Sequence, residues 1–121
     1  MKTVVALVLL GLATQLHARA ELVIGKVQGV RAPFCTTQAD AEAIARADSE
    51  EGIPKAREVL ATKDDCAPGT AVVYPRRVTY SGKTERGSTV RVIEVEVEMN
   101  DDTRETFYMI IDVDIVGLIE T

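Results

Sequence analysis

The residue types that most enzymes use for catalysis are scarce in this 121-residue chain. Its single histidine, His17, lies in the N-terminal segment, although imidazole is the commonest general base, proton shuttle and metal ligand at neutral pH. The glycine-rich turns that bind nucleotide phosphates are also missing from the sequence. After residue 20 the chain can form no Ser-His-Asp or Cys-His site and no His-bearing zinc site. We therefore expect no cofactor, no metal and no enzymatic activity.

Carboxylates are the remaining candidates for catalysis. Asp112 and Asp114 share one face of the last predicted strand, and Glu94, Glu96 and Glu98 share one face of the preceding strand. Such groups could serve glycoside hydrolysis or bind calcium, so a small carboxylate-dependent hydrolase is an alternative function. Solvated sheet faces carry the same pattern, which discourages edge pairing, and only 4% of the residues are aromatic. We expect these carboxylates to lie on a solvated face.

Charge is separated along the second half of the chain. Residues 70–91 hold five basic side chains against one acidic one, a balance of +4, and residues 92–121 hold one basic against nine acidic, a balance of -8. One interpretation is that Arg77 and Arg91 pair across the sheet with the glutamate row. The other is that the loop at 81–88 presents a basic tip to an acidic partner. The candidate partner-binding residues are Arg76, Arg77, Lys83, Arg86, Arg91 and Tyr80.

The first twenty residues have the layout of a secretory signal peptide. Lys2 supplies a short positive start, residues 4–12 are apolar, and Ala18 and Ala20 are the small residues that a signal peptidase reads. The apolar stretch is much shorter than the ~20 residues that cross a bilayer. We expect residues 1–20 to be removed and residues 21–121 to form one small domain, secreted or periplasmic, with no membrane span.

Removal of this segment changes the composition of the working protein. It takes away two of the 14 basic residues and none of the 19 acidic ones, so the net charge becomes 12 - 19 = -7, and no histidine remains. A chain this acidic is unsuited to nucleic acid, which requires clustered positive charge. Two cysteines in a small exported chain usually pair. We predict a disulfide between Cys35 and Cys66, which closes a loop of about thirty residues and stabilises the fold by about 3 to 4 kcal/mol. A reactive thiol is the alternative, but neither cysteine lies in a Cys-x-x-Cys spacing.

Apolar periodicity and breakers predict the elements of the fold. They indicate an irregular strand at 22–30, an alanine-rich helix at 37–50, and a second helix from Pro54 to Lys63. Alternation then predicts strands at 71–80, 90–99 and 107–115, with Pro75 on an edge or at a bulge. The doublet Val92-Ile93 breaks the alternation as a bulge in that strand would.

The last two predicted strands form a hairpin whose register parity can be tested. A three-residue loop at 101–103 places Val97 opposite Phe107 and keeps the apolar residues of both strands on one face. The resulting fold class is α+β: an antiparallel sheet of about four strands in β-α-α-β-β-β order, with a disulfide-tied helical pair packed on one face. This order is similar to that of cystatin-like inhibitors. The resemblance is one of topology, since none of their hairpin motifs is present, and it implies no functional residues.

The hypothesis we prefer is a small exported, non-catalytic binding module. It would bind a protein or an envelope ligand, in an inhibitor-like manner, through its sheet face or its charged hairpin loops. Besides the hydrolase, a structural or assembly subunit remains open. Such a subunit would pair through a strand edge, either at Leu22–Val30 or at Ile115–Ile119.

Overall fold

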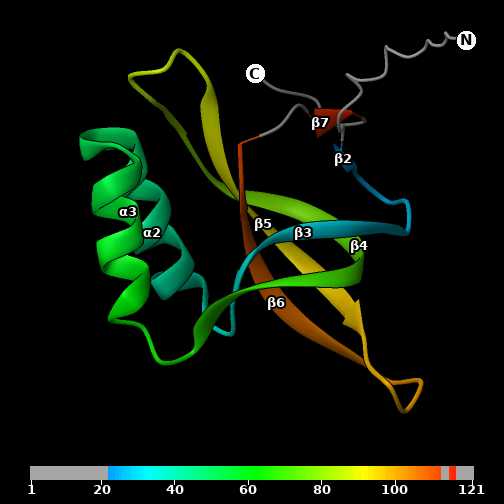
Figure 1. Ribbon diagram of the computed structural model, residues 1–121. Helices are drawn as coiled ribbons and strands as arrows, with labels where there is room; N and C mark the ends of the chain where they lie inside the picture. Colours follow the sequence, from blue (N-terminus) through cyan, green and yellow to red (C-terminus); the bar gives the residue numbers. More distant parts are fainter. Residues whose placement is uncertain (1–21, 113–114, 117–121) are drawn as a thin grey trace, which may run out of the picture.

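The computed structural model describes residues 22–112 and 115–116. The expected signal peptide, Asp114 and the end of the proposed C-terminal edge therefore lie outside the described residues. The order of helices and strands confirms the α+β class, and both helices lie on the same side of the sheet (Figure 1). The elements are β2 (Leu22–Val23), β3 (Gln28–Cys35), α2 (Gln38–Glu51), α3 (Ile53–Ala61), β4 (Cys66–Lys83), β5 (Thr89–Glu98), β6 (Arg104–Ile111) and β7 (Ile115–Val116).

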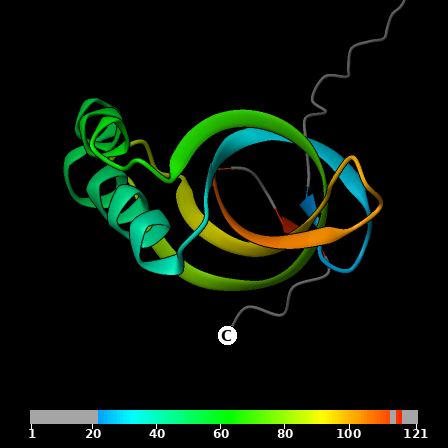
Figure 2. The same ribbon diagram turned by 90° about the horizontal axis from the view of Figure 1, so that it is seen from below.

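The sheet closes on itself, which the sequence did not indicate. Strands β3, β4, β5 and β6 form an antiparallel barrel in that order, and β3 returns to pair with β6. Seen along its axis, the strands run around a ring and the helices lie beside it (Figure 2). The closing contact is short, because only Phe34 and Cys35 of β3 pair with β6. The predicted first strand is divided into β2 and β3, and β2 pairs in parallel with β7.

The two helices begin and end at residues typical of those positions. Thr37 is the N-cap of α2, and its hydroxyl accepts a hydrogen bond from the N–H of Asp40 at 3.3 Å. Gly52 ends α2 with a φ of 98°, a conformation that favours glycine. Pro54 then lies in the first turn of α3, where its missing N–H costs nothing. Both predicted helices are confirmed to within a few residues.

The face of α2 that packs on the barrel is small and apolar. Ala41, Ile44 and Ala45 of the helix form one buried cluster with Val90 and Val92 of β5. In contrast, α3 has no buried residue and packs mainly against α2. The side chains inside the barrel form a separate core cluster. The sheet therefore has an apolar surface on both sides where α2 covers it.

This two-sided burial explains the doublet at Val92-Ile93. Val92 lies beneath α2 and Ile93 points into the barrel, and both are fully buried. A bulge in this strand is the wrong interpretation, since β5 pairs with β6 without interruption over 91–98. The extra residue belongs to β4, where Thr79 lies between the positions paired with Ile93 and Val92. A second register shift directly follows Pro75, as expected for a proline in a paired strand.

The loop between β5 and β6 has three residues, as predicted, but begins one residue earlier. It comprises Asn100–Asp102, and the N–H of Met99 donates to the carbonyl of Thr103 at 2.8 Å. Loops of this kind require a left-handed conformation at the third residue. Asp102 adopts it with a φ of 64°, and aspartate tolerates it well. The predicted loop would have placed the β-branched Thr103 there, where such a φ is strongly disfavoured.

This shift moves the hairpin register by two residues. Val95, and not Val97, lies opposite Phe107, and Ile93 lies opposite Met109. Because the shift is even, the apolar residues of both strands still share the inner face, as predicted.

Helix α2 contacts β4 tightly at a glycine. The hydroxyl of Ser49 donates a hydrogen bond to the carbonyl of Lys83 at 2.6 Å. A Cβ atom at Gly82 would lie 2.7 Å from that hydroxyl oxygen and 2.8 Å from the hydroxyl oxygen of Tyr80. Any larger residue would push the helix or these side chains away.

We therefore expect Gly82→Ala to lower the free energy of unfolding by about 1 to 3 kcal/mol through overpacking. Gly29 in β3 is a matched control, because a Cβ atom there meets nothing within 4 Å and its φ is not positive. Urea denaturation of both variants measures the difference. Equal midpoints for Gly82→Ala and Gly29→Ala would contradict this account of the contact.

Candidate functional site

A pocket of about 430 Å³ lies at the end of the barrel where β3 ends and β4 begins. Its apolar lining includes Phe34, Val97 and Phe107, which come from three different strands. The two aromatic rings meet edge to face, with centroids 6.5 Å apart and an interplanar angle of 89°. The other residues that line the pocket are Thr36, Asp64, Asp65, Cys66, Ala67, Gly69, Thr70 and Ala71.

The space exists because β4 begins with small side chains. Ala67, Gly69 and Ala71 alternate along the strand with the same parity as Val73, which is a core residue of the barrel. A Cβ atom at Gly69 would meet nothing within 4 Å. This pocket was not predicted from the sequence. Its signal was the run of small residues at 67–71 before the larger ones, which acquires a meaning only once the barrel is known to close.

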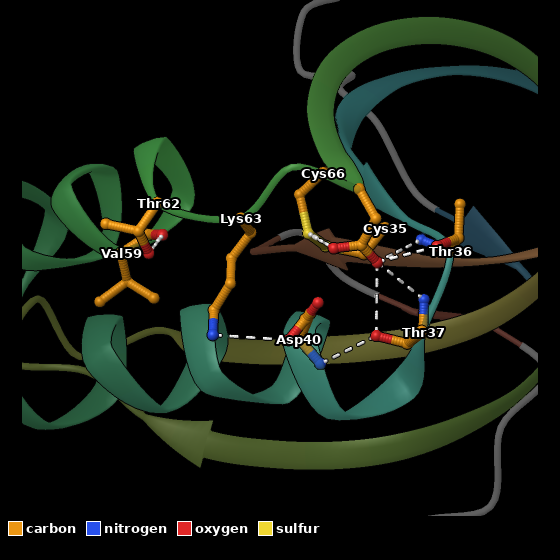
Figure 3. The surroundings of a disulfide bond; sticks show 9 residues. Cys35, Thr36, Thr37, Asp40, Val59, Thr62, Lys63 and Cys66 are labelled. Carbon is orange, nitrogen blue, oxygen red and sulfur yellow. Dashed lines mark hydrogen bonds and ion pairs between the residues drawn. A yellow bond between two sulfur atoms is a disulfide. The ribbon is translucent and has the colours of Figure 1, made fainter.

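The disulfide between Cys35 and Cys66 borders the pocket and is confirmed (Figure 3). The two cysteines lie opposite each other on β3 and β4, and their Cα atoms are 4.1 Å apart. The bond joins the start of α2 to the end of α3, so the whole helical segment begins and ends at one point of the barrel. A disulfide of this kind indicates an oxidising environment of the extracellular type.

Asp65 joins the same point by hydrogen bonds. Its Oδ2 atom accepts from the backbone N–H groups of Thr36 and Thr37, both at 3.2 Å, and from their hydroxyls at 2.8 and 3.3 Å. A hydrogen bond with the carboxyl group of Asp40, followed by those from Thr36, lowers the pKa of Asp65 to about 2. Because Thr36 follows one cysteine and Asp65 precedes the other, the disulfide itself brings these residues together.

Asp40, Asp65 and Cys66 place potential ligand atoms within 4.8 Å of one another. This group does not have the chemistry of a metal site, however. The sulfur of Cys66 is oxidised in the disulfide, and the ammonium of Lys63 lies 3.4 Å from Asp40 (Figure 3). The carboxylates serve instead to cap the first turn of α2.

Two of the predicted partner-binding arginines are paired within the sheet. Arg76 and Arg77 of β4 each lie 2.8 Å from a glutamate of β5, the first from Glu96 and the second from Glu94. Arg104 of β6 also reaches Glu96, at 3.5 Å. The glutamate row thus lies on an outer face where cross-strand arginines neutralise it, which agrees with the interpretation of a solvated, ion-paired surface.

Arg91 does not belong to this surface. It has the opposite parity to the glutamates on the uninterrupted strand β5, so it lies on the other face. The expected pairing of Arg91 with the glutamate row is therefore wrong. Tyr80 is half-buried, with the guanidinium of Arg46 5.1 Å from the centre of its ring. Lys83 ends β4 and is exposed.

Arg86, at the tip of the β4–β5 hairpin, is bound within the protein. Its guanidinium donates to both carboxylate oxygens of Asp48 on α2, at 2.9 and 3.0 Å, and to Asp112 at 2.7 Å. These hydrogen bonds raise the pKa of Arg86 above its ordinary value. Ser88 also donates to Asp112 at 2.9 Å. The hairpin tip is thereby attached to α2 and to the end of β6.

Asp48 and Asp112 also line a second pocket, of about 280 Å³, between the helices and the sheet. This pocket has two carboxylates and apolar side chains in its lining, the combination that a carboxylate-dependent hydrolase would require. Both carboxylates are tied to the one guanidinium of Arg86, however, which is the arrangement of a structural ion pair and not of an acid and a base flanking a substrate.

Comparison of the chain with models of known protein families, with curated proteins and with solved structures finds no match. Among the described residues, neither helix has the length and apolar character needed to cross a membrane. The function must therefore be argued from the site.

The cap formed by Asp65 predicts a dependence of stability on pH. Its pKa is about 2 in the folded protein against an ordinary value of 3.8, so the unfolded chain binds more protons between these values. The stabilisation is complete above pH 4 and disappears as the pH falls towards 2. We expect Asp65→Asn to lower the urea midpoint at pH 7, and the difference from the unmodified protein to shrink between pH 4 and 2. Asp64→Asn, at an exposed neighbouring carboxylate, is the control. A constant difference over this range would contradict the cap.

Proposed function

We propose that this protein is a small exported, non-catalytic binding module, and that its binding site is the pocket at the open end of the barrel. The observation that carries the proposal is an apolar pocket between Phe34, Val97 and Phe107, bordered by a disulfide. Its volume of about 430 Å³ lies in the range of ligand pockets, roughly 300 to 1,000 Å³. A disulfide-tied wall favours binding, because little conformational freedom is lost when the ligand is bound.

The pocket is a better candidate for binding than the charged sheet face or the charged hairpin tip. On the sheet face, the arginines and glutamates already pair with one another. At the hairpin tip, Arg86 is engaged with Asp48 and Asp112. A partner would have to break these ion pairs before it could use the charges. In contrast, the pocket exposes aromatic and aliphatic groups that gain free energy directly when a ligand removes them from water.

The non-catalytic part of the proposal rests on the absence of imidazole after residue 20 and on the use of the two cysteines in the disulfide. The carboxylates at the pocket do not form an acid and base pair. Asp65 is committed to its four hydrogen bonds from Thr36 and Thr37, and Asp64 is exposed. We therefore favour binding over carboxylate-dependent hydrolysis.

The pocket can be tested by filling it. We expect Gly69→Phe to leave the fold intact, because the residue lies in a strand with an ordinary φ and open space at its Cβ position. The new ring should occupy the pocket and weaken the binding of the neutral apolar dye Nile red at least tenfold. Fluorescence titration of the dye measures this effect.

The control is Gly29→Phe, which adds the same side chain at another open glycine that does not line this pocket. Its affinity should stay within twofold of the original protein. Equal binding by the Gly69→Phe and Gly29→Phe variants would place the dye elsewhere and remove the basis of the proposed site.

Export is the second testable part of the proposal. We expect the protein expressed from the full sequence to be recovered outside the cytoplasm, in the periplasm or the medium, with Glu21 as its first residue. Ala20→Arg should block cleavage, because a signal peptidase requires a small residue there, and Ala20→Ser should permit it. Intact-mass measurement of the protein recovered from each variant shows whether the first twenty residues have been removed. An uncleaved chain that stays in the cytoplasm would contradict export.

A further inference from the structure

One edge of β6 runs beside the pocket, and no strand of the described residues pairs with its first part. Strand β3 pairs with β6 only where Phe34 and Cys35 face Met109 and Tyr108. It then ends, because the chain turns at Thr36 to enter α2. Within the part of the chain that the structure describes, the start of β6, at 104–107, therefore pairs with β5 alone. A longer β3 would have covered this edge.

The hydrogen-bonding groups on that edge follow from the alternation of an antiparallel ladder. The bond from Met99 to Thr103 fixes which positions of β6 point their N–H and C=O groups towards β5. These positions are the odd-numbered residues, because the N–H and C=O groups of successive residues point to opposite edges of a strand. Arg104 and Thr106 therefore point their backbone N–H and C=O groups away from β5. Tyr108 does the same where it pairs with Cys35. Among the backbone hydrogen bonds outside the regular ladders of the described chain, none reaches Arg104 or Thr106.

The open edge and the pocket are parts of one surface. Phe107 belongs to the edge segment and lines the pocket. Side chains of a strand paired with Arg104 and Thr106 would alternate between the outside and the inside of the barrel. One inward side chain would then enter the space beside Phe34 and Phe107. Main-chain hydrogen bonds to β6 would supply affinity, and the pocket would determine which inward side chain is accepted.

Two carboxylates, one at the pocket and one on β6, add negative charge to this surface, while the guanidinium of Arg104 is paired with Glu96 and Glu98. Asp64 lines the pocket, and Glu105 lies two residues before Phe107 on the same face of β6. Neither carboxylate takes part in an ion pair with another described residue. This differs from the outer sheet face, where the glutamates are paired with arginines. Basic residues in the partner would complete the site.

A second copy of the chain fits this edge poorly. If two copies paired antiparallel through Arg104 and Thr106, Glu105 of one copy would face Glu105 of the other. Like charges directly opposite on neighbouring strands destabilise the pair. The edge therefore favours a different chain.

We propose that the edge of β6 at Arg104–Phe107 binds an extended peptide segment of a partner protein, which pairs as an added strand and inserts one large apolar side chain into the pocket, with lysine or arginine nearby. The inference rests on the proposed function and adds the chemical class of the ligand. The added strand continues the line of β3 beyond Cys35, antiparallel to β6.

The test begins with displayed random nine-residue peptides, selected against the oxidised mature protein. We expect enriched peptides to carry an apolar residue flanked by lysine or arginine. A synthetic copy with a tryptophan reports binding by fluorescence, because the protein contains no tryptophan. Thr106→Pro removes an outward N–H, and proline is tolerated at such an edge. It should weaken binding at least tenfold, whereas Thr106→Ala, which keeps the N–H, should stay within twofold.

N-methylation of the peptide provides a test that leaves the protein unchanged. Methylation of one amide that pairs with β6 should also weaken binding at least tenfold, even if the proline variant fails to fold. Equal affinity of the methylated peptides, or of the folded Thr106→Pro variant, would overturn the added strand. A failure to enrich any peptide, with Nile red still bound, would overturn it too and leave the pocket as a small-molecule site. Peptides that bind the Gly69→Phe variant as tightly as the original protein would instead contradict the proposed pocket.

Discussion

The Cys35–Cys66 disulfide is the constraint on which the other features of this structure depend. It joins two directly opposed residues of β3 and β4, so the loop of about thirty residues that holds both helices starts and ends at one point of the barrel. That position places Asp65 beside Thr36 and Thr37, and the N-terminus of α2 is capped from outside its own sequence. Strand β3 ends at the same cysteine, where the chain turns towards α2, and does not cover the start of β6. The disulfide therefore anchors the helices beside the open end of the barrel.

The outer face of β5 shows how the chain divides its charged and apolar surface. Val90 and Val92 lie beneath α2, and the residues of the same parity further along the strand are glutamates. The change occurs where the helix no longer covers the sheet. The arginines of β4 and β6 lie across from these glutamates, so the separation of charge along the sequence becomes pairing between neighbouring strands. Each exposed pair contributes at most about 1 kcal/mol, but together the pairs leave little charge on this face for a partner.

Local patterns were enough to predict the helices, the disulfide, the order of the elements and the parity of the hairpin. The exact hairpin register could also have been predicted, because the choice between Asp102 and Thr103 for the left-handed position depends on side-chain type alone. Closure of the barrel could not be predicted from the sequence. It depends on two residue pairs between β3 and β6, more than seventy positions apart, and no local periodicity reports such a contact. The pocket depends on this closure, so its aromatic residues looked like ordinary core positions. The partners of Arg86 lie 38 and 26 positions away, on α2 and after β6, and no local pattern reports these contacts either.

The contrast between paired and unpaired groups decides where a partner would bind. On the sheet face, the arginines and glutamates lie within 4 Å of one another. At the hairpin tip, Arg86 lies within 4 Å of Asp48 and Asp112. A ligand that used these charges would have to replace the ion pairs that it breaks. At the open end of the barrel, three kinds of group have no such partner among the described residues: exposed apolar surface, outward backbone groups, and the carboxylates of Asp64 and Glu105. A small apolar molecule would use only the first of these. An extended peptide uses all three at once, because its backbone, its inward side chain and its basic residues address separate groups. The proposed recognition of a peptide therefore leaves fewer of these groups unpaired than the binding of a small apolar molecule would.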